Sequence, residues 1–265
     1  MGYNPVWMDS LMRSLDWGVI MSDEIPVTYL SYNERKYKEK YIFNVPFYYR
    51  QKDSDSSEGI FLGADSDAGA STIKENLMGS LPSAYITGHN VSNLINKVTV
   101  GYHDDMSFLD FPIPFVCVAT DMLSYRAKIW HSGDITKALR STMSIPGVFA
   151  PVKTDGMVLV DGGMRNNFPT DIAREAGADI IIGVDLSDRA LGYDEVNNLG
   201  DLLNQTIDML GRDAFETNVG IPDVFIKPDL TGYGMMSFDK QSVADIIARG
   251  YQAAVNNADA IRRVK

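Results

Sequence analysis

From residue 112 onward, short apolar segments alternate with segments of helical periodicity, and this alternation limits the possible folds more than any other feature. The predicted strands are four apolar runs, at 114–120, 157–160, 179–187 and 223–228. The predicted helices cover 135–143, 168–177, 197–218 and 241–263. Strands that are apolar throughout are covered on both faces, as in parallel sheets flanked by helices. The pattern therefore predicts an α/β fold with a mostly parallel sheet.

The composition is that of an ordinary globular protein. The 265 residues are 45% hydrophobic and 22% charged, which suits one α/β domain or two small domains. The formal net charge of −11 argues against a nucleic-acid partner, because contact with phosphates needs a basic face. The single cysteine, Cys117, excludes an internal disulfide and a cysteine-based zinc site. No run of 18 apolar residues is present, and the opening MGYNPVWMDS has neither the charged nor the apolar region of a signal peptide.

The first part of the chain contains two segments with helical spacing and one unusual segment. Asn4 and Pro5 suit the cap and first turn of a helix, and apolar residues continue with helical spacing to Leu15. Residues 91–98 have the same spacing. Residues 34–52 hold six basic, two acidic and six aromatic side chains. This segment could lie on a lipid surface, or it could be a surface segment whose aromatic rings pack inward.

Asp161-Gly162-Gly163 is the sharpest candidate site. It follows the apolar run 157–160, so the carboxylate is expected at the carboxyl end of a buried strand. The two glycines allow a sharp turn and the close approach of another group. A carboxylate in this place can act as a base, orient a base or bind a metal, or it can cap its own turn. From the residues alone, both kinds of role remain open.

The other titratable candidates are weaker. Asp121 follows the run 114–120 and Asp185 lies within 179–187, and a local turn or cap is the favoured role for each. The three histidines are His89, His103 and His131. None of them has another histidine three or four residues away, so a helical metal site is not expected. His103, Asp104 and Asp105 could chelate a cation, but a solvated loop is the favoured interpretation.

No complete motif for a serine elbow, a nucleotide or calcium is present. The string nearest to a G-x-S-x-G elbow, residues 69–73, lacks the last glycine. The G-x-G at 232–234 is not completed by a third glycine, and no G-x-x-x-x-G-K loop exists. In DSDSSEG (53–59), Glu58 stands where a calcium loop requires glycine. We therefore expect no cofactor.

Three longer strings together resemble the patatin-like phospholipase family. They are LPSAYITGHNVSNLINKV, DFPIPFVCVATDM, and the run from Gly133 to Ser187 that contains STMSIPGVFAPV and LVDGGMRNNFPTDIAREAGADIIIGVDLS. The similarity is dense over about residues 81–188 and extends more loosely to the first 17 residues. The combination of S-I-P-G-V-F-x-P-V with D-G-G-x-x-x-N-x-P is highly specific.

The resemblance implies a three-layer α/β/α acyl hydrolase with a Ser–Asp dyad and no catalytic histidine. Asp161 matches the dyad Asp, and Gly162 and Gly163 match its turn. In the family, the serine stands in a G-x-S-x-G elbow, and a glycine-rich loop supplies N–H groups to the oxyanion. The implied partner is a lipid or phospholipid ester substrate.

The chain departs from the family pattern because it contains neither the glycine-rich loop nor the serine elbow. The resemblance places Met1 just after the helix that follows the elbow. Residues 1–265 are therefore expected to be a partial patatin-like domain without its first strands. It would comprise a helical, lid-like region (1–110) and a regular α/β part (111–265). An uncovered strand edge would favour oligomers, and the resemblance to bacterial members implies a location in the envelope, either periplasm or outer membrane.

Two functional hypotheses follow. In the first, the chain is part of a lipid acyl hydrolase, carries Asp161 as the dyad acid and is inactive on esters by itself. Ester turnover by this chain would then need another nucleophile, for which Ser71 and Ser144 are the candidates. In the second, the chain is a non-catalytic module that binds lipid or a partner. Only the first predicts an in-frame G-x-S-x-G sequence in the DNA upstream of the codon for Met1.

Overall fold

The structure is a computed structural model that describes residues 2–23, 84–102, 106–187, 192–194, 196–197, 199–234 and 237–264. The chain divides into two units, and all of the described residues belong to the unit formed by 1–24 and 83–265. The basic and aromatic segment 34–52, Ser71 and His103 lie outside the described residues.

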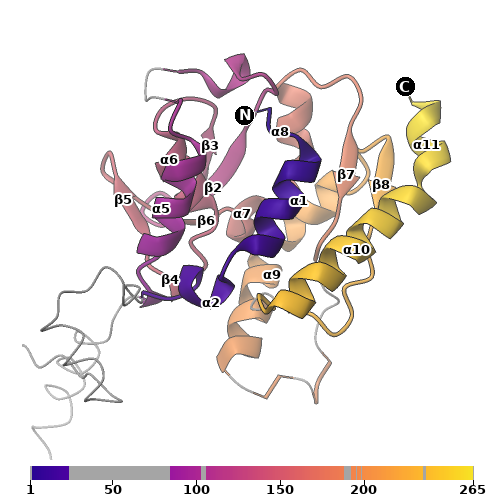
Figure 1. The fold of residues 1–265 in the computed structure, drawn as a ribbon. Coiled ribbons are helices and arrows are strands. Elements are labelled where there is room, and N and C mark those ends of the chain that lie inside the picture. The colour runs from indigo at the N-terminus through magenta and orange to yellow at the C-terminus, as the bar shows by residue number, and fades with distance from the viewer. Residues whose placement is uncertain are drawn as a thin grey trace, which may run out of the picture. The chain divides into compact units, whose positions relative to one another are not determined.

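Strands of the described residues form three separate sheets (Figure 1). The largest has the order β3-β2-β6-β5, with β2 at Cys117–Asp121, β3 at Arg126–Trp130, β5 at Val152–Thr154 and β6 at Met157–Asp161. The two-stranded sheets pair β1 (Ala84–Ile86) with β4 (Gly147–Phe149), and β7 (Ile182–Val184) with β8 (Val224–Ile226).

The α/β class is confirmed, but the prediction of a mostly parallel sheet is wrong for the largest sheet. All of its pairings are antiparallel, whereas β1–β4 and β7–β8 are parallel. Two hairpins cause the difference. Residues 122–125 join β2 to β3, while Asp155 and Gly156 join β5 to β6 with φ angles of 49° and 73°, as in a two-residue hairpin turn. Connections this short join only antiparallel strands, because a parallel pair needs a long crossover.

Helices make up much of the remaining described chain. They are α1 (Pro5–Ser14), α2 (Trp17–Ile20), α5 (His89–Val98), α6 (Ile135–Thr142), α7 (Gly163–Asn166), α8 (Thr170–Glu175), α9 (Leu199–Asn218), α10 (Lys240–Asn256) and α11 (Ala258–Arg263), with a 3₁₀ helix at Phe108–Asp110. α1 packs on α10, although the two come from opposite ends of the sequence (Figure 1). Among the described helices, none combines the length and the hydropathy needed to cross a membrane.

Side-chain caps explain where several helices begin. Asn4 Oδ1 accepts a 2.8 Å hydrogen bond from the N–H of Val6, as the sequence predicts for the first helix. Asp134 caps α6 and Asp239 caps α10 in the same way. These oxygens pair with N–H groups that the helix itself leaves unbonded. Gly177, with φ of 96°, follows α8 as expected for a left-handed C-terminal residue.

The helices predicted from residue 135 onward are present, with one interruption. The prediction for 241–263 is divided at Asn257, whose side-chain amide donates a 2.9 Å hydrogen bond to the carbonyl oxygen of Ala253. The chain then continues as α11. The sequence pattern does not predict β3, and it does not predict α7, which is only four residues long.

An apolar core holds α6 on the antiparallel sheet. The buried Ile135 and Ala138 of α6 lie in one cluster with Trp130 of β3 and Leu159 of β6. Trp130 also donates a 3.1 Å hydrogen bond from Nε1 to the hydroxyl of Ser141. Burial of an Ile or Leu side chain contributes roughly 1.5–3 kcal/mol. α6 is therefore a firm support for β6, the strand that carries the candidate site.

Candidate active site

Asp161 is the last residue of β6, as the sequence predicts. Its backbone N–H donates a 2.9 Å hydrogen bond to the carbonyl oxygen of Ser144, which lies just beyond α6. Its carboxylate oxygen Oδ1 accepts a 2.7 Å hydrogen bond from the N–H of Gly163. In the described part of the chain no other donor meets this carboxylate, so Oδ2 can accept a hydrogen bond from another group.

Burial is the main influence on the charge of Asp161. The side chain is half-buried, and this raises the pKa of its carboxyl, while the hydrogen bond from Gly163 lowers the pKa by less. A carboxylate with a raised pKa accepts a proton more readily. The two roles expected from the sequence are thus compatible, because one oxygen caps the turn and the other can act as a base.

Gly162 is required by close packing against main chain, while Gly163 lies close to side-chain oxygens. Gly162 has an ordinary helical backbone (φ −68°, ψ −23°), but a Cβ there would lie 2.2 Å from the carbonyl oxygen of Val118 in β2. A Cβ on Gly163 would lie 2.8 Å from Oδ1 of Asn167. Gly211 of α9 is equally constrained, because its Cβ would lie 2.4 Å from the carbonyl oxygen of Gly163. The glycines therefore let β2, α7 and α9 meet at the turn.

A buried polar network holds α7 in place, and sequence reasoning missed it. Asn166 Nδ2 donates to Asp171 Oδ1 (2.9 Å), and Asn218 Nδ2 donates to Asn166 Oδ1 (3.1 Å) and to Asp171 Oδ1 (2.8 Å). Thr170 completes it by donating through Oγ1 to the carbonyl oxygen of Asn218 (2.8 Å). Asn166 lies inside the D-G-G-x-x-x-N-x-P string, but nothing in the sequence points to Asn218, which is 52 residues away.

Asp121 has the local role that the sequence favours. Its oxygens accept hydrogen bonds from the N–H groups of Leu123 (3.2 Å) and Ser124 (3.1 Å), from the Ser124 hydroxyl (2.6 Å) and from the N–H of Val158 (3.1 Å). The Ser124 hydroxyl is the main reason that the pKa of Asp121 is lowered. Asp121 therefore caps the β2–β3 hairpin and links it to β6.

Asp185 bonds to one residue close in the sequence and to one distant residue. Its Oδ1 accepts from the N–H of Ser187 (2.8 Å), and its Oδ2 forms a 2.6 Å ion pair with Nζ of Lys227, just beyond β8. Burial acts to raise the pKa of Asp185, but the bonds from Lys227 and Ser187 outweigh burial and lower it. The side chain of Asp185 is only 3% exposed, so this pair joins the ends of β7 and β8.

The three candidate carboxylates do not converge on one edge of a sheet. Asp121 and Asp161 end neighbouring strands, but β2 and β6 are antiparallel, with Asp121 opposite Leu159 and Ala119 opposite Asp161. The carboxyl ends of β2 and β6 therefore point in opposite directions along the sheet. Asp185 belongs to the separate β7–β8 region. Asp161 is the one whose carboxylate retains an unpaired oxygen among the described residues.

Ser144 is buried and hydrogen-bonded, as is typical of a residue with a structural role. Its side chain is fully buried, and its Oγ accepts a 2.8 Å hydrogen bond from Nη1 of Arg140 and donates one of 2.8 Å to the carbonyl oxygen of the same residue. His89 and His131 are exposed. Within the described ranges, no group of three or more His, Cys, Asp or Glu side chains could hold a metal ion.

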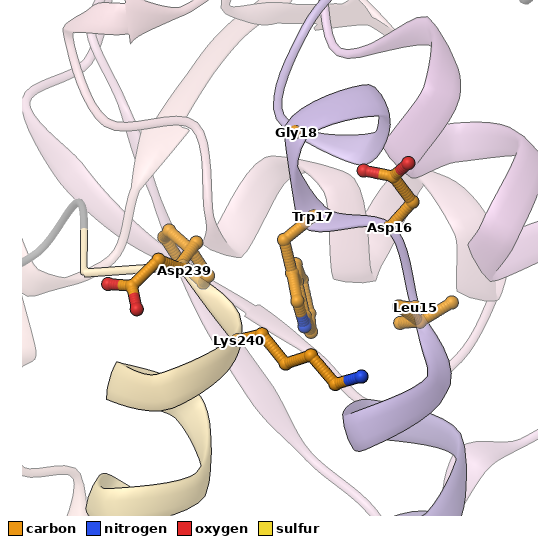
Figure 2. A pocket seen from close by; sticks show the side chains of 7 residues that line it. Leu15, Asp16, Trp17, Gly18, Asp239 and Lys240 are labelled. Atoms are coloured by element: carbon orange, nitrogen blue, oxygen red, sulfur yellow. The ribbon is translucent and has the colours of Figure 1, made fainter.

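The pocket in Figure 2 lies elsewhere. Residues 15–18, at the junction of α1 and α2, and residues 238–240, at the start of α10, line it. The ring of Trp17 lies at its centre, 5.2 Å from the ring of Phe238 between centroids. Its two carboxylates, Asp16 and Asp239, cap α2 and α10. Asp161 does not line this pocket.

Comparison with known proteins identifies relatives of this chain. Patatin-like phospholipase domain-containing protein 7 of Mus musculus is 31% identical over 102 residues, which are 38% of this chain and 7% of the relative. Lysophospholipase nte1 of Aspergillus fumigatus is 28% identical over 182 residues, 59% of this chain and 12% of the relative. An uncharacterized NTE family protein of Mycobacterium bovis is 37% identical over 81 residues, 31% of this chain and 22% of the relative. The chain thus spans less than a quarter of each of these proteins.

The family match covers a larger part of the chain and includes the candidate site. The model of the family described as patatin-like phospholipase matches residues 31–174, a range that contains Asp161. This range is more than half of the 265 residues. The chain therefore belongs to the patatin-like phospholipase family.

Proposed function

We propose that this chain carries the acid of a Ser–Asp dyad in a lipid acyl hydrolase, and that Asp161 is this acid. The supporting observation is the state of its carboxylate, in which Gly163 fixes Oδ1 and no donor of the described residues occupies Oδ2. Membership of the patatin-like phospholipase family supports a lipid ester as the substrate class. The name of the Aspergillus relative, a lysophospholipase, is consistent with this class.

In the proposed reaction, Oγ of the serine attacks the carbonyl carbon of the ester while its proton passes to Asp161. The tetrahedral intermediate expels the alcohol, which takes up that proton and leaves an acyl-serine. Water then attacks the acyl-serine while Asp161 again accepts a proton, and the fatty acid leaves as the serine regains its proton. The raised pKa of Asp161 suits a group that must accept and return a proton.

The serine of this dyad is not among the 265 residues in our proposal. They contain no G-x-S-x-G string, and the hydroxyl of Ser144 is buried and bonded to Arg140. We therefore expect the purified chain to release no p-nitrophenol from p-nitrophenyl butyrate above the buffer rate. Turnover by this chain that Asp161→Asn abolishes would overturn this point, because it would require a second nucleophile.

The decisive test uses the DNA upstream of the codon for Met1. An in-frame G-x-S-x-G sequence supports the dyad, and the protein expressed with it should hydrolyse the same ester. In that protein, Asp161→Asn should lower kcat at least about 10²-fold. Asp155→Asn is the matched control, because Asp155 is exposed in a hairpin turn and its φ of 49° is one that Asn adopts readily. Equal turnover by wild type and Asp161→Asn would contradict the proposal.

A stop codon directly upstream would instead favour a non-catalytic module that binds lipid or a partner. The observation that favours this second candidate is that these 265 residues contain no G-x-S-x-G string. For either candidate, lipid contact through 34–52 stays a prediction. Co-sedimentation with anionic vesicles tests it by comparing wild type with a variant in which Lys36, Lys38 and Lys40 are all changed to Glu. Equal binding of both would remove this segment from the lipid contact.

A further inference from the structure

Arg140 of α6 is a buried cation without a close carboxylate partner. Its side chain is 5% exposed, and within the described residues no carboxylate oxygen lies within 4.0 Å of it. Its guanidinium lies over the ring of Phe149, with Cζ 4.9 Å from the ring centroid. The charge of Asp23 acts on this cation without an ion pair, and burial of a cation is costly unless its donors are hydrogen-bonded. The positions of these bonds therefore indicate its role.

One end of the guanidinium joins the chain after two parallel strands. Nη2 donates to the carbonyl oxygen of Thr87, just after β1, at 2.8 Å, and to that of Ala150, just after β4, at 3.3 Å. Gly88 lies against the same group, since a Cβ there would be 2.2 Å from Nη2. Asp23 also holds this loop, because its carboxylate accepts hydrogen bonds from the N–H (2.7 Å) and the hydroxyl (2.6 Å) of Thr87.

The other end of the guanidinium leads to the candidate acid. Nη1 donates to the hydroxyl of Ser144 at 2.8 Å, and that hydroxyl donates back to the carbonyl oxygen of Arg140. The carbonyl oxygen of Ser144 then receives the backbone N–H of Asp161 at 2.9 Å. Ser144 is thus held through its side chain by Arg140, and it holds Asp161 through its main chain.

The same segment also supports the residue that follows Asp161. Thr142 donates through Oγ1 to the carbonyl oxygen of Val118, and this oxygen is the atom against which Gly162 packs. Residues 142–144 therefore support the Asp161-Gly162 turn directly through Ser144 and indirectly through Thr142 and Val118. A planar guanidinium with several fixed donors is suited to hold such a segment in one geometry.

We propose that Arg140 is a positioning residue for Asp161, because it fixes Ser144 and Ser144 in turn fixes the main chain that carries the carboxylate. The inference rests on the proposed function only for the role of Asp161. The positioning itself can be measured without any ester substrate. In this proposal, the side chain of Arg140 fixes the ends of β1 and β4 relative to the end of β6.

The test follows the Gly163 amide by ¹⁵N–¹H NMR in the full 265-residue chain as the pH is changed. This N–H donates to Asp161 Oδ1, so its chemical shift reports protonation of that carboxyl. Arg140→Met removes all of the side-chain hydrogen bonds, and Arg140→Lys keeps the charge but not the planar fork. We expect both variants to move the midpoint of the Gly163 titration downward, by about 0.5 pH unit or more for Arg140→Met, because a looser turn admits water to Asp161. Arg262→Met, an exposed arginine of α11, is the control and should leave the midpoint unchanged.

A merely structural role gives a different result. It would lower the melting temperature of Arg140→Met and leave the Gly163 midpoint where it is in wild type, and this outcome overturns the proposal. If Arg140→Met does not fold, Ser144→Ala tests the same step, because it keeps the bonds from Arg140 to Thr87 and Ala150. An unchanged midpoint in Ser144→Ala would equally overturn it. If the ester hydrolase proposal fails but the Gly163 midpoint shifts in these variants, the positioning role of Arg140 is still supported.

Discussion

Gly162 packs directly against the main chain of Val118, so that a Cβ on Gly162 would lie 2.2 Å from the carbonyl oxygen of Val118. The turn that carries Asp161 therefore lies on β2 with no space for a side chain. The backbone angles of Gly162 suit any residue, so packing alone explains the glycine.

We expect Gly162→Ala to lower the free energy of unfolding by about 1–3 kcal/mol, because β2 and the turn must separate to admit the methyl group. Gly250→Ala in α10 is the control, since nothing lies within 4 Å of its Cβ position. That variant should be more stable by about 0.5–1 kcal/mol through helix propensity. Urea unfolding followed by circular dichroism measures both. A Gly162→Ala chain as stable as wild type would show that β2 does not hold the turn this closely.

The pH dependence of stability should reveal the burial of Asp161. Its folded pKa is raised above the ordinary value of 3.8 by burial. The folded state therefore favours the protonated form, and stability is lost as the pH rises through the raised pKa. Asp161→Asn removes the charge and can keep the bond from Gly163. It should be more stable than wild type near neutral pH, and the difference should vanish below pH 3.8.

Urea unfolding at several pH values checks this prediction, with Asp155→Asn as the exposed control. The control should follow wild type at every pH. A variant Asp161→Asn that is less stable than wild type at neutral pH would show that the charged carboxylate is favoured in the fold, against the direction given by burial.

Lys227 should matter more than an ordinary surface lysine. Asp185 is 3% exposed, and Lys227 is its ion-pair partner at 2.6 Å. Lys227→Met would leave a buried carboxylate without a cation. Because Lys227 itself is 49% exposed, we expect a loss of about 1–3 kcal/mol, less than for a fully buried pair.

The sign of the pH effect is opposite to that for Asp161. The folded pKa of Asp185 is lowered, so the pair stabilises the fold at neutral pH and its contribution is lost as the pH falls through that lowered value. The difference between wild type and Lys227→Met should therefore disappear in acid. Arg212→Met breaks the exposed pair with Glu216 and should cost less than about 0.5 kcal/mol at any pH. Equal losses for the two variants would contradict a special role for Asp185.

The chain should associate through the outer edge of β7. In the described part of the chain β7 pairs only with β8, and Ile182 and Val184 are 44% and 48% exposed. An unpaired strand edge with apolar side chains promotes pairing between molecules. Light scattering after size exclusion should show a mass that rises with concentration, and Val184→Lys should reduce it.

The matched control for this edge is Val100→Lys, at a position that is 88% exposed in the turn after α5. It should associate as wild type does. A wild-type chain that stays monomeric at all concentrations and melts cooperatively would disprove the association.

Cys117 should be unreactive in the folded chain. It begins β2, and burial raises the pKa of its thiol to about 12. The thiolate is the reactive form, so reaction with Ellman's reagent near pH 8 should be at least about 100-fold slower than after unfolding in guanidinium. Rapid reaction of the folded chain would show that the start of β2 is open to solvent.

Local sequence predicted much of this protein. The caps at Asn4 and Gly177, the apolar runs of β2, β6, β7 and β8, and the position of Asp161 at the end of a strand depend on neighbours in the chain. The Asp155-Gly156 pair is typical of a hairpin turn, but the prediction of a mostly parallel sheet did not take it into account. Motif similarity also pointed to the family, which the match over residues 31–174 confirms.

Pairing between distant segments was decided only by the tertiary structure. Apolar runs alone do not show whether β2 and β6 are antiparallel, because direction depends on the hairpins and on which strands meet. Asn218 and Arg140 look like ordinary helical residues in the sequence, and their roles arise from partners 52 and 53 positions away. The sequence by itself determined that a carboxylate ends β6. The bond from Gly163 to one of its oxygens is equally local, since it spans two residues. The fold decided that Ser144, whose side chain is bonded to Arg140, holds the main chain of Asp161, because that contact forms only when the segment after α6 meets β6.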